Sequence, residues 1–357
     1  MLLVGEILTN AARVTPDGVA ATLGDAALTF AELEAASNEV ANGLAGAGAG
    51  YGDRVLWWGD TSLDALPVFG ALAKLGVVFA PLNARASVEE VRPVAEYARP
   101  RLLLAGASHR DAAAELAAAT AIPHLDPVPA GSSRPPAPAP LGETDPHVIF
   151  FTSGSTGRPK GVVLSHRANW LRTYPGATST TGGGGTVCMF PLFHMAGWTI
   201  ALGAWQARRP VHFVAVPDAD TLCGTVARHR AARLYCIPAV WARVLEHARV
   251  REDLASLVEA DTGTSATPPE LLLAIKEALP WTVTRVFYGS TEAGPGTQLG
   301  DVDLSRKPGS VGLPQAGVDV RLDDRGEVCM RSAFLMDGYF DAPDATAETL
   351  RDGWYHT

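Results

Sequence analysis

The sequence has few of the residues that build disulfide frameworks, zinc sites, membrane spans or nucleic-acid surfaces. Its four cysteines are widely spaced without a CxxC pair, which argues against a disulfide framework and against a zinc site. The nine histidines form no HExxH motif, and no apolar run approaches the roughly 18 residues of a membrane span. The formal net charge of −9 is opposite to the basic footprint of a nucleic-acid-binding protein. We therefore expect neither a transmembrane segment nor a nucleic-acid partner.

The first residues also lack the features of a secretory signal. Glu6 follows the first apolar residues closely, and neither a basic leader nor a small-residue cleavage site is present. A cytoplasmic location with reduced cysteines is the expectation. At 47% hydrophobic and 19% charged residues the chain can bury a large core, and a length of 357 residues predicts two or three domains.

Short apolar runs alternate with amphipathic segments in the first part of the chain. Thr29 and Glu32 have the spacing of a capping box and predict the start of a helix. Strands are expected at 55–58, 77–80 and 102–104, and helices around 63–75 and 88–98. This alternation predicts α/β architecture, with mostly parallel sheets that carry helices on both faces.

Composition suggests where this chain divides. A proline-rich stretch at 127–140 reads as a stiff, extended linker. We therefore predict a first α/β subdomain at 1–140, which the linker closes, and a second at 141–306. After about residue 306 the pattern changes to short β-like stretches and turns, which predicts a small β-rich subdomain at 307–357.

The most informative stretch, residues 152–160, is named here the phosphate loop. An apolar run, Val148 to Phe151, gives way abruptly to TSGSTGRPK, as expected for a buried strand that ends in a turn. Glycine backbone, hydroxyl groups and a lysine suit anionic phosphate oxygens, although the spacing is not that of a Walker loop. The candidate phosphate ligands are Thr152, Ser153, Gly154, Ser155, Thr156, Gly157 and Lys160. The alternative is a solvated Ser/Gly hairpin without a ligand.

Two further motifs follow predicted strands, PLFHMAGW after Phe190 and YGSTEAG after Phe287. Because ligands bind beyond the carboxyl ends of parallel strands, these motifs and the phosphate loop are predicted to line one crevice. Other readings stay open for each motif. His194 can be a core histidine, and YGSTEAG can be a turn capped by Ser290 or Thr291.

The segment TSGSTGRPKGVVLSH resembles the phosphate-binding signature of the adenylate-forming superfamily, which includes acyl-CoA synthetases, luciferases and the adenylation domains of peptide synthetases. PLFHMAGW, TGTSATPPEL and YGSTEAG resemble later motifs of this family and follow in the family order. The resemblance implies the family's N-terminal domain, namely two packed doubly wound α/β subdomains plus a small β-barrel-like subdomain.

The resemblance also implies residue roles. His194, Met195, Gly197 and Trp198 would border the acyl pocket; Gly263, Thr264 and Ser265 would border the adenine; Tyr288, Gly289, Ser290 and Thr291 would continue the nucleotide site. Glu292 would hold Mg²⁺, for which a carboxylate is a suitable ligand. Lys160, His194, Thr291 and Glu292 would be the catalytic residues. Thr264 and Ser265 depart from the family's small-residue pattern.

The function implied is an acyl-CoA synthetase of the fatty-acid–CoA ligase type. ATP would activate a small-molecule carboxylic acid as an acyl-adenylate, and CoA would then take the acyl group. PLFHMAGW contains no acidic residue to bind an amine, so an amine-free acid is expected. The alternatives are an acyl-AMP ligase that loads a carrier protein and a nucleotide-binding module without turnover.

The last residues resemble a family motif that continues further than this sequence. We therefore expect the chain to be the N-terminal part of such an enzyme and to be nearly inactive alone, since the resemblance places the adenylation lysine in a later domain. Whether the protein forms a homodimer is left open.

Overall fold

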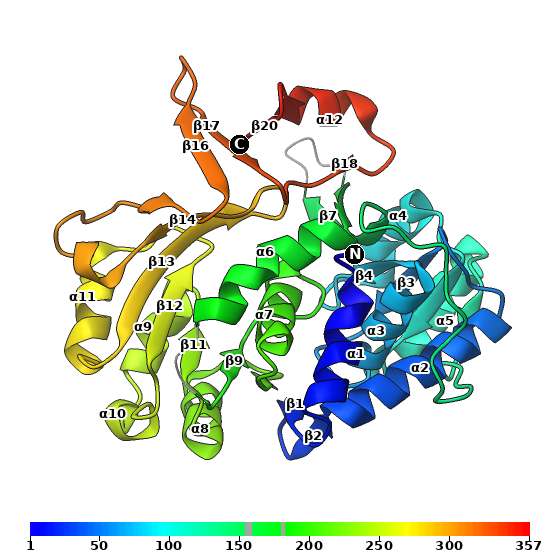
Figure 1. Cartoon of the computed structure of the whole chain (residues 1–357), viewed down its shortest axis with the longest axis horizontal. Coiled ribbons are helices and arrows are strands. Elements are labelled where there is room, and N and C mark those ends of the chain that lie inside the picture. Colours follow the sequence, from blue (N-terminus) through cyan, green and yellow to red (C-terminus); the bar gives the residue numbers. More distant parts are fainter. Residues whose placement is uncertain (154–158, 180–182) are drawn as a thin grey trace.

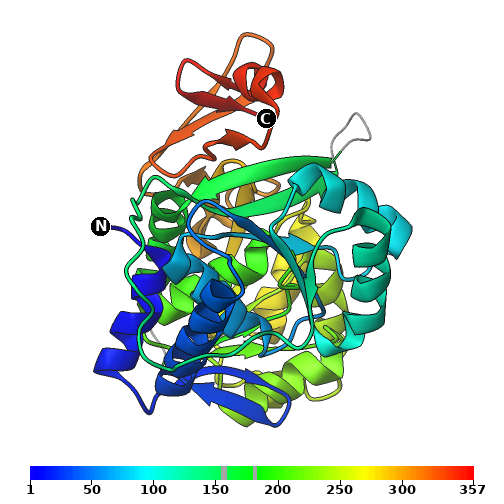
Figure 2. The ribbon, with the colours of Figure 1, turned by 90° about the vertical axis from the view of Figure 1, so that its right-hand side faces the viewer.

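Three β-sheets organise the computed structural model, which describes residues 1–153, 159–179 and 183–357. Two large sheets stand on either side of a group of helices, and a small sheet lies above both (Figures 1 and 2). The α/β class predicted from the alternating pattern is confirmed.

The seven-stranded sheet contains the strands predicted in the first part of the chain. In spatial order it consists of β18 (Gly338–Tyr339), β8 (Pro159–Ser165), β7 (Pro146–Ser153), β4 (Val78–Leu82), β3 (Arg54–Trp58), β5 (Leu102–Ala105) and β6 (His124–Leu125). From β7 to β6 the strands are parallel, and β8 and β18 add an antiparallel edge.

The nine-stranded sheet combines the second half of the chain with a hairpin from its beginning. Its order is β15 (Leu313–Pro314), β14 (Gly294–Leu299), β13 (Val283–Ser290), β12 (Glu259–Gly263), β11 (Arg233–Tyr235), β9 (Thr186–Cys188), β10 (Val211–Phe213), β1 (Val19–Leu23) and β2 (Ala26–Thr29). The first strand, β1, pairs in parallel with β10, so Ala21 lies opposite Val211.

Helices cover both faces of each large sheet. Between the sheets lie α1 (Val4–Val14), α2 (Phe30–Gly46), α3 (Ala65–Leu75), α6 (His166–Ser179) and α7 (Met195–Gln206) (Figure 1). The outer face of the seven-stranded sheet carries α4 (Val88–Ala98) and α5 (Arg110–Thr120). Beside the nine-stranded sheet lie α8 (Ala219–His229), α9 (Pro238–Leu245), α10 (Val250–Asp253) and α11 (Pro269–Ala278), and short 3₁₀ turns occur at Ala107–His109 and Asp301–Asp303.

Strand alternation distributes the apolar side chains between two cores. In β3, Val55 and Trp57 point into the large core between the sheets, whereas Leu56 and Trp58 face α4 and α5. A strand buried on both faces reads as a continuous apolar run because neither face meets water. This explains why the run from Val55 to Trp58 was recognisable in the sequence.

Helix starts follow local hydrogen bonding. The predicted capping box is confirmed: Thr29 accepts from the backbone of Glu32, and the Glu32 carboxylate accepts from the backbone of Thr29 at 2.8 Å. Ser87 and Glu90 form a second capping box, which fixes the start of the predicted helix at Val88.

The β-rich end of the chain forms an antiparallel sheet. Its order is β16 (Val318–Leu322), β17 (Val328–Ser332), β20 (Trp354–His356) and β19 (Leu350–Arg351), with α12 (Pro343–Thr349) beside it. Between β17 and α12 the chain leaves the small sheet, and β18 pairs with β8 at the edge of the seven-stranded sheet. This region therefore reaches the strand that follows the phosphate loop.

The membership of the sheets does not follow the order of the chain. Strand β7, which precedes the phosphate loop, pairs with β4 and so belongs to the sheet of the first part of the chain. Conversely, β1 and β2 join the nine-stranded sheet. Sheet membership depends on long-range pairing, which no local pattern reports. The division of the chain at residues 140 and 306 stays a proposal.

The proline-rich segment does not bridge two separate bodies. It lies along α2, where the Asn42 side-chain amide donates to the carbonyl oxygens of Ser132 and Arg134 at 2.7 and 2.9 Å. Gly131 also donates its backbone N–H to the Glu39 carbonyl oxygen. Capture of backbone carbonyls by an amide side chain explains why this stretch is held against the helix.

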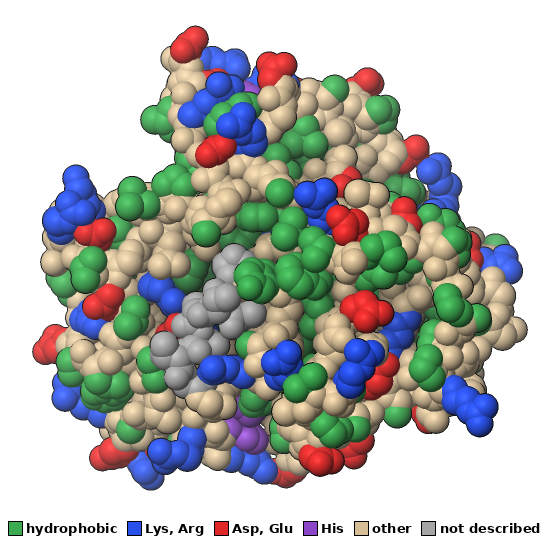
Figure 3. Space-filling model, viewed as in Figure 1, with side chains coloured by type: hydrophobic (Ala, Val, Ile, Leu, Met, Phe, Trp, Pro, Cys, Tyr) green, Lys and Arg blue, Asp and Glu red, His purple; other side chains and the backbone are tan. Residues whose placement is uncertain are grey.

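Acidic and basic side chains alternate over the face of the molecule seen in Figure 3, without a large area of one sign. Within the described parts of the chain, no helix combines the length and apolar character needed to span a bilayer.

Candidate active site

The phosphate loop connects β7 and β8, an antiparallel pair in which Thr152 lies opposite Lys160. The predicted ligands Gly154, Ser155, Thr156 and Gly157, with the side chain of Ser153, lie outside the described residues. After the loop, a Cβ on Gly161 would lie 2.8 Å from Ile149 Cγ2 and 3.2 Å from Phe340 Cβ. Glycine at this position allows the segment around β18 to approach β8 closely.

The YGSTEAG motif forms the turn between β13 and β14. Ser290 Oγ accepts a hydrogen bond from the backbone N–H of Ala293 at 3.0 Å. Ser290 therefore caps the turn, as the alternative interpretation of this motif predicts. A Cβ on Gly289 would lie 2.2 Å from the carbonyl oxygen of Gly294, so glycine is required for the two strands to meet. This turn sets the direction of the Thr291 and Glu292 side chains.

Arg172, in α6, ties three chain segments together around this turn. Its Nη1 donates to the carbonyl oxygen of Thr291 at 3.0 Å and lies 2.8 Å from Met195 Sδ, while Nη2 donates to the Phe334 carbonyl oxygen at 2.6 Å. Burial lowers the pKa of Arg172 to about 10, so the guanidinium is still charged at neutral pH. Sequence reasoning missed this residue because it lies outside the recognised motifs.

Two predicted site residues from different motifs meet at Tyr339. The Tyr339 hydroxyl donates to Glu292 Oε1 at 3.1 Å, and Lys160 Nζ lies 4.8 Å from the centre of the Tyr339 ring. Burial and the negative charge of Glu292 raise the pKa of Tyr339, so the phenol stays protonated and can donate. The structure thus brings Lys160 and Glu292 together through a residue that the sequence did not single out.

The donor set around Glu292 fits a divalent cation. A hard cation such as Mg²⁺ prefers carboxylate oxygen together with phosphate oxygens and water. One Glu292 oxygen is held by Tyr339, which orients the carboxylate, and Lys160 adds a positive charge suited to phosphate. Glu292 is partly exposed, so a ligand can reach it.

The segment predicted to border the adenine begins at the end of β12. Gly263 has φ of 150°, and a Cβ there would lie 2.2 Å from the Phe287 carbonyl oxygen and 2.8 Å from the Tyr235 hydroxyl. Thr264 has φ of 65°, a strained conformation for a β-branched residue that is found preferentially at ligand sites. Thr264 and Ser265 are exposed, and the Thr264 hydroxyl donates to the Gly263 carbonyl oxygen at 2.5 Å.

PLFHMAGW starts α7 at the end of β9. His194 is the N-cap residue of the helix and is exposed; partial loss of hydration and the positive charge of Arg85 lower its pKa. A Cβ on Gly197 would lie 2.9 Å from the Pro191 carbonyl oxygen, which explains the glycine. Met195 is half-buried beside Arg172.

Trp198 lies in the core between the two large sheets. It is 2% exposed, stacks on Phe69 with ring centres 3.8 Å apart, and meets Phe79 edge-on at 5.4 Å. Its indole N–H donates to the Leu192 carbonyl oxygen at 2.6 Å. These contacts account for the tryptophan by packing alone, so its place beside an acyl group stays a prediction.

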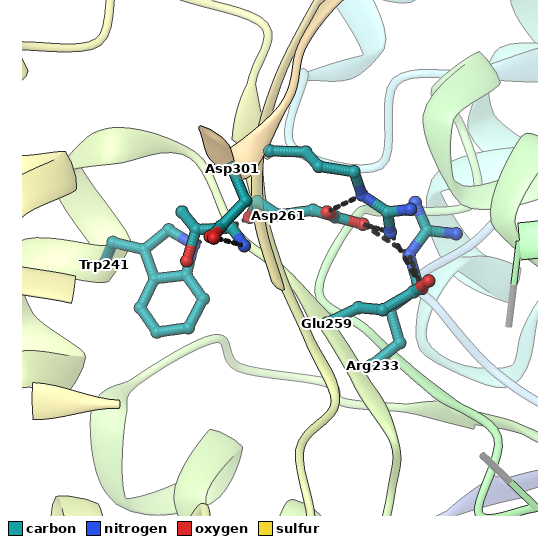
Figure 4. A network of polar contacts seen from close by, with 7 residues as sticks. Arg233, Trp241, Glu259, Asp261 and Asp301 are labelled. Carbon is teal, nitrogen blue, oxygen red and sulfur yellow. Dashed lines mark hydrogen bonds and ion pairs between the residues drawn. The ribbon is translucent and has the colours of Figure 1, made fainter. Parts of the chain in front are cut away.

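A buried network of charges lies in the nine-stranded sheet (Figure 4). The Asp261 carboxylate accepts from Arg233 Nε at 2.6 Å and from Arg285 Nε and Nη2 at 2.8 and 2.9 Å. Glu259 forms an ion pair with Arg285 at 2.8 Å, and burial raises the pKa of its carboxyl group against the effect of the two arginines. We name these four residues the ion cluster.

The ion cluster is separated from the strand ends by aromatic rings. Both guanidinium groups lie over the Phe287 ring, with Arg285 5.5 Å from its centre. The ring centres of Phe287 and Tyr235 lie 5.7 Å apart, and the Tyr235 ring meets the Phe190 ring edge-on with centres 5.2 Å apart. The ion cluster therefore packs against the first of three aromatic rings in contact, those of Phe287, Tyr235 and Phe190.

A second group of metal-type ligands lies in the small sheet. Glu327, Cys329 and His356 place their ligand atoms within 4.8 Å of one another, because strand pairing sets Cys329 opposite His356. Nδ1 of His356 already lies at hydrogen-bond distance from Glu327, and Arg351 lies 3.4 Å from the same carboxylate. Hydrogen bonds and an ion pair account for this group without a metal.

The fold is that of the N-terminal domain of adenylate-forming enzymes. The N-terminal domain of FACL13 from Mycobacterium tuberculosis has a TM-score of 0.91 and 26% identity, covering 100% of this chain and 96% of that one. O-Succinylbenzoate CoA synthetase from Bacillus subtilis has a TM-score of 0.89 over 98% of this chain and 94% of that one, at 22% identity, and supports the fold alone.

The chain belongs to the AMP-binding enzyme family, whose family model matches residues 8–340. Feruloyl-CoA synthase of an Amycolatopsis species is 32% identical over 99% of this chain and 75% of that protein. The long-chain-fatty-acid–CoA ligase FadD13 of Mycobacterium tuberculosis is 27% identical over the same shares. The chain thus spans about three quarters of the length of these relatives, which are CoA ligases.

Proposed function

We propose that the protein activates an amine-free carboxylic acid with ATP and transfers the acyl group to CoA. The observation that carries this proposal is the contact at Tyr339, which joins the lysine of the phosphate loop to the carboxylate of the YGSTEAG turn. A phosphate-binding cation beside a metal-suited carboxylate is the arrangement that nucleotide activation requires. Family membership supports the same reaction.

In this proposal each motif has one task. The phosphate loop with Lys160 binds the β- and γ-phosphates, Thr291 donates to the α-phosphate, and Glu292 binds Mg²⁺, which would neutralise charge on the phosphates. Tyr288 and the backbone from Gly263 to Ser265 border the adenine. The protein mainly positions reactants and stabilises charge, because attack of a carboxylate on the α-phosphorus needs no side-chain nucleophile.

The acid is proposed to lie near the start of α7. The described part of PLFHMAGW offers no carboxylate to bind a substrate ammonium group, and His194 is exposed at the helix start. Three aromatic rings, those of Phe190, Tyr235 and Phe287, contact one another in the second half of the chain, which suits an apolar or aromatic acyl group nearby. One relative is named as a feruloyl-CoA synthase and another as a long-chain-fatty-acid–CoA ligase, so both aromatic and aliphatic acids are included in the test.

The experiment is a panel of acids offered to the purified protein. Hydroxycinnamates, fatty acids of several lengths and amino acids are compared for acid-dependent AMP release, with free CoA or with a phosphopantetheinylated carrier protein as acceptor. Turnover with amine-free acids and CoA is expected. A preference for amino acids would contradict the acid class, transfer only to the carrier would make the protein an acyl-AMP ligase, and ATP binding without AMP release would indicate a binding module.

A further inference from the structure

We propose that Tyr339 is a positioning residue that keeps Lys160 and Glu292 apart and correctly directed for magnesium-ATP. This inference rests on the proposed function and adds a residue to it. The hydroxyl of Tyr339 holds the Glu292 carboxylate, and its ring faces the Lys160 ammonium. One side chain therefore contacts the predicted metal ligand and the predicted phosphate ligand.

The backbone around Tyr339 is fixed on both sides. In β18 it pairs with Val162 of β8, two residues after Lys160. Its N–H donates to Thr346 Oγ1 at 2.8 Å, and the next residue, Phe340, donates to the Gly161 carbonyl oxygen at 2.7 Å. Tyr339 is 9% exposed, so the residue is buried among its neighbours.

The segment also holds the backbone of the metal ligand. The N–H of Met336, three residues before Tyr339, donates to the carbonyl oxygen of Glu292 at 2.7 Å. Gly338 has φ of 147°, and a Cβ there would lie 2.8 Å from Thr346 Cγ2. Because residue 338 is glycine, the backbone just before Tyr339 can approach α12 closely.

Lys160 and Glu292 carry opposite charges and contact the same side chain, that of Tyr339. Among the described residues, Lys160 and Glu292 form no ion pair with each other, although both contact Tyr339. A direct pair would occupy the ammonium needed for phosphate and the carboxylate oxygens needed for the cation. The hydroxyl bond leaves the other Glu292 oxygen available, and the cation–π contact stabilises the lysine without neutralising it.

Two substitutions separate the hydroxyl from the ring. Tyr339→Phe keeps the ring and its packing but removes the hydrogen bond to Glu292, whereas Tyr339→Leu removes both contacts. Tyr97→Phe is the matched control, because the Tyr97 hydroxyl donates to the carbonyl oxygen of Phe340, one residue further along the same segment. It removes a comparable hydrogen bond without touching Lys160 or Glu292.

The measurement is ATP binding by titration calorimetry, in EDTA and across a series of Mg²⁺ concentrations. Loss of a residue that orients a metal ligand typically lowers metal affinity by about tenfold or more. Tyr339→Phe is therefore expected to raise the Mg²⁺ concentration at half-effect about tenfold and to leave ATP affinity in EDTA unchanged. Tyr339→Leu should in addition weaken ATP binding in EDTA several-fold, while Tyr97→Phe should alter neither.

A double-mutant cycle with Glu292→Gln completes the test. If Tyr339 acts through the Glu292 carboxylate, the effect of Tyr339→Phe on Mg²⁺ should largely disappear in the Glu292→Gln background. An unchanged Mg²⁺ requirement in Tyr339→Phe, an equal shift in Tyr97→Phe, or full additivity in the cycle would overturn the inference. Failure of the unsubstituted protein to bind ATP would instead contradict the proposed function itself.

Discussion

In the nine-stranded sheet, two arginines and two carboxylates are buried as charged partners, whereas beside the seven-stranded sheet two histidines are buried neutral. In the ion cluster, the Asp261 carboxylate is fully buried between two guanidinium groups. His147 and His166 are also fully buried, with ring centres 4.6 Å apart, and burial lowers both pKa values, that of His166 to about 4.

The difference shows two ways to bury an ionisable group. A buried charge is retained when an opposite charge and hydrogen bonds replace water, and it becomes costly when one partner is removed. A buried histidine can give up its proton and act as a neutral acceptor, and it becomes costly when it must be protonated. The stability contributed by the nine-stranded sheet should therefore be sensitive to mutation of single charges, and that contributed by the seven-stranded sheet should be sensitive to acid.

The largest effect is expected from Asp261→Asn. The substitution keeps the shape of the side chain but leaves Arg233 and Arg285 with less compensating charge in a buried place. Removing one partner of a buried pair typically costs about 3–5 kcal/mol. The check is the free energy of unfolding in urea, and a loss below about 1 kcal/mol would contradict the importance given to the cluster.

Acidification should act on the other sheet. The backbone N–H of Val4 donates to His166 Nδ1 at 3.2 Å, and the Asn169 amide donates to His147 Nδ1 at 3.0 Å, so protonation at Nδ1 would break either bond. Because the folded-state pKa of His166 lies below its unfolded value, the unfolded chain binds more protons as the pH falls from about 6.5 toward 4. Stability is thus fully present above this window and is lost within it.

For His166 alone the expected loss between pH 8 and pH 5 is about 2 kcal/mol. Urea unfolding at the two pH values measures it, with His166→Asn as the comparison, since that variant should lose less stability on acidification. Equal pH dependence of the two proteins would show that His166 is not the source.

An intermediate effect is expected at Glu292, which is partly exposed in the turn between β13 and β14. Glu292→Gln keeps the hydrogen-bond acceptor for Tyr339 but removes the negative charge that a divalent cation requires. Magnesium-dependent ATP binding should weaken tenfold or more, about 1.4 kcal/mol, without a comparable loss of folding stability. Calorimetry shows whether the magnesium requirement persists unchanged, which would count against this role.

The smallest effect is expected from an exposed pair. Arg331 and Asp319 lie opposite each other in the small sheet, with Nη2 2.7 Å from the carboxylate and about half of each side chain exposed. Water already solvates both groups, so Asp319→Asn should change the free energy of unfolding by less than about 0.5 kcal/mol. A change as large as that of Asp261→Asn would mean that burial does not explain the difference between the two pairs.

Much of the fold was predictable where the signal was local. The helix at 88–98 follows from a periodic pattern and has the predicted bounds, and the buried strand from Val55 was visible as an apolar run. In contrast, the place of β1 beside β10 depends on pairing between distant segments. Nothing in residues 19–23 distinguishes a strand of one sheet from a strand of the other.

The candidate site shows the same limit. Lys160 and Glu292 were recognisable because their neighbours form motifs to which the resemblance assigns roles. Tyr339 lies 47 residues after Glu292, in the last stretch that resembles a family motif, but no role was assigned to it there. Arg172 was missed for a related reason, since its partners Thr291 and Phe334 offer backbone carbonyls that any sequence possesses. The assigned ligand roles stay predictions until they are tested.

The pairing of β1 with β10 has a consequence during synthesis. Ala21 leaves the ribosome about 190 residues before its partner Val211, which at about 5–20 residues per second is an interval of about 10–40 s. Throughout that time the apolar side of β1 and the helices that later lie between the sheets have no second sheet to cover them. We expect the nascent chain to depend on chaperone protection in this interval, and the demand to end when β10 emerges.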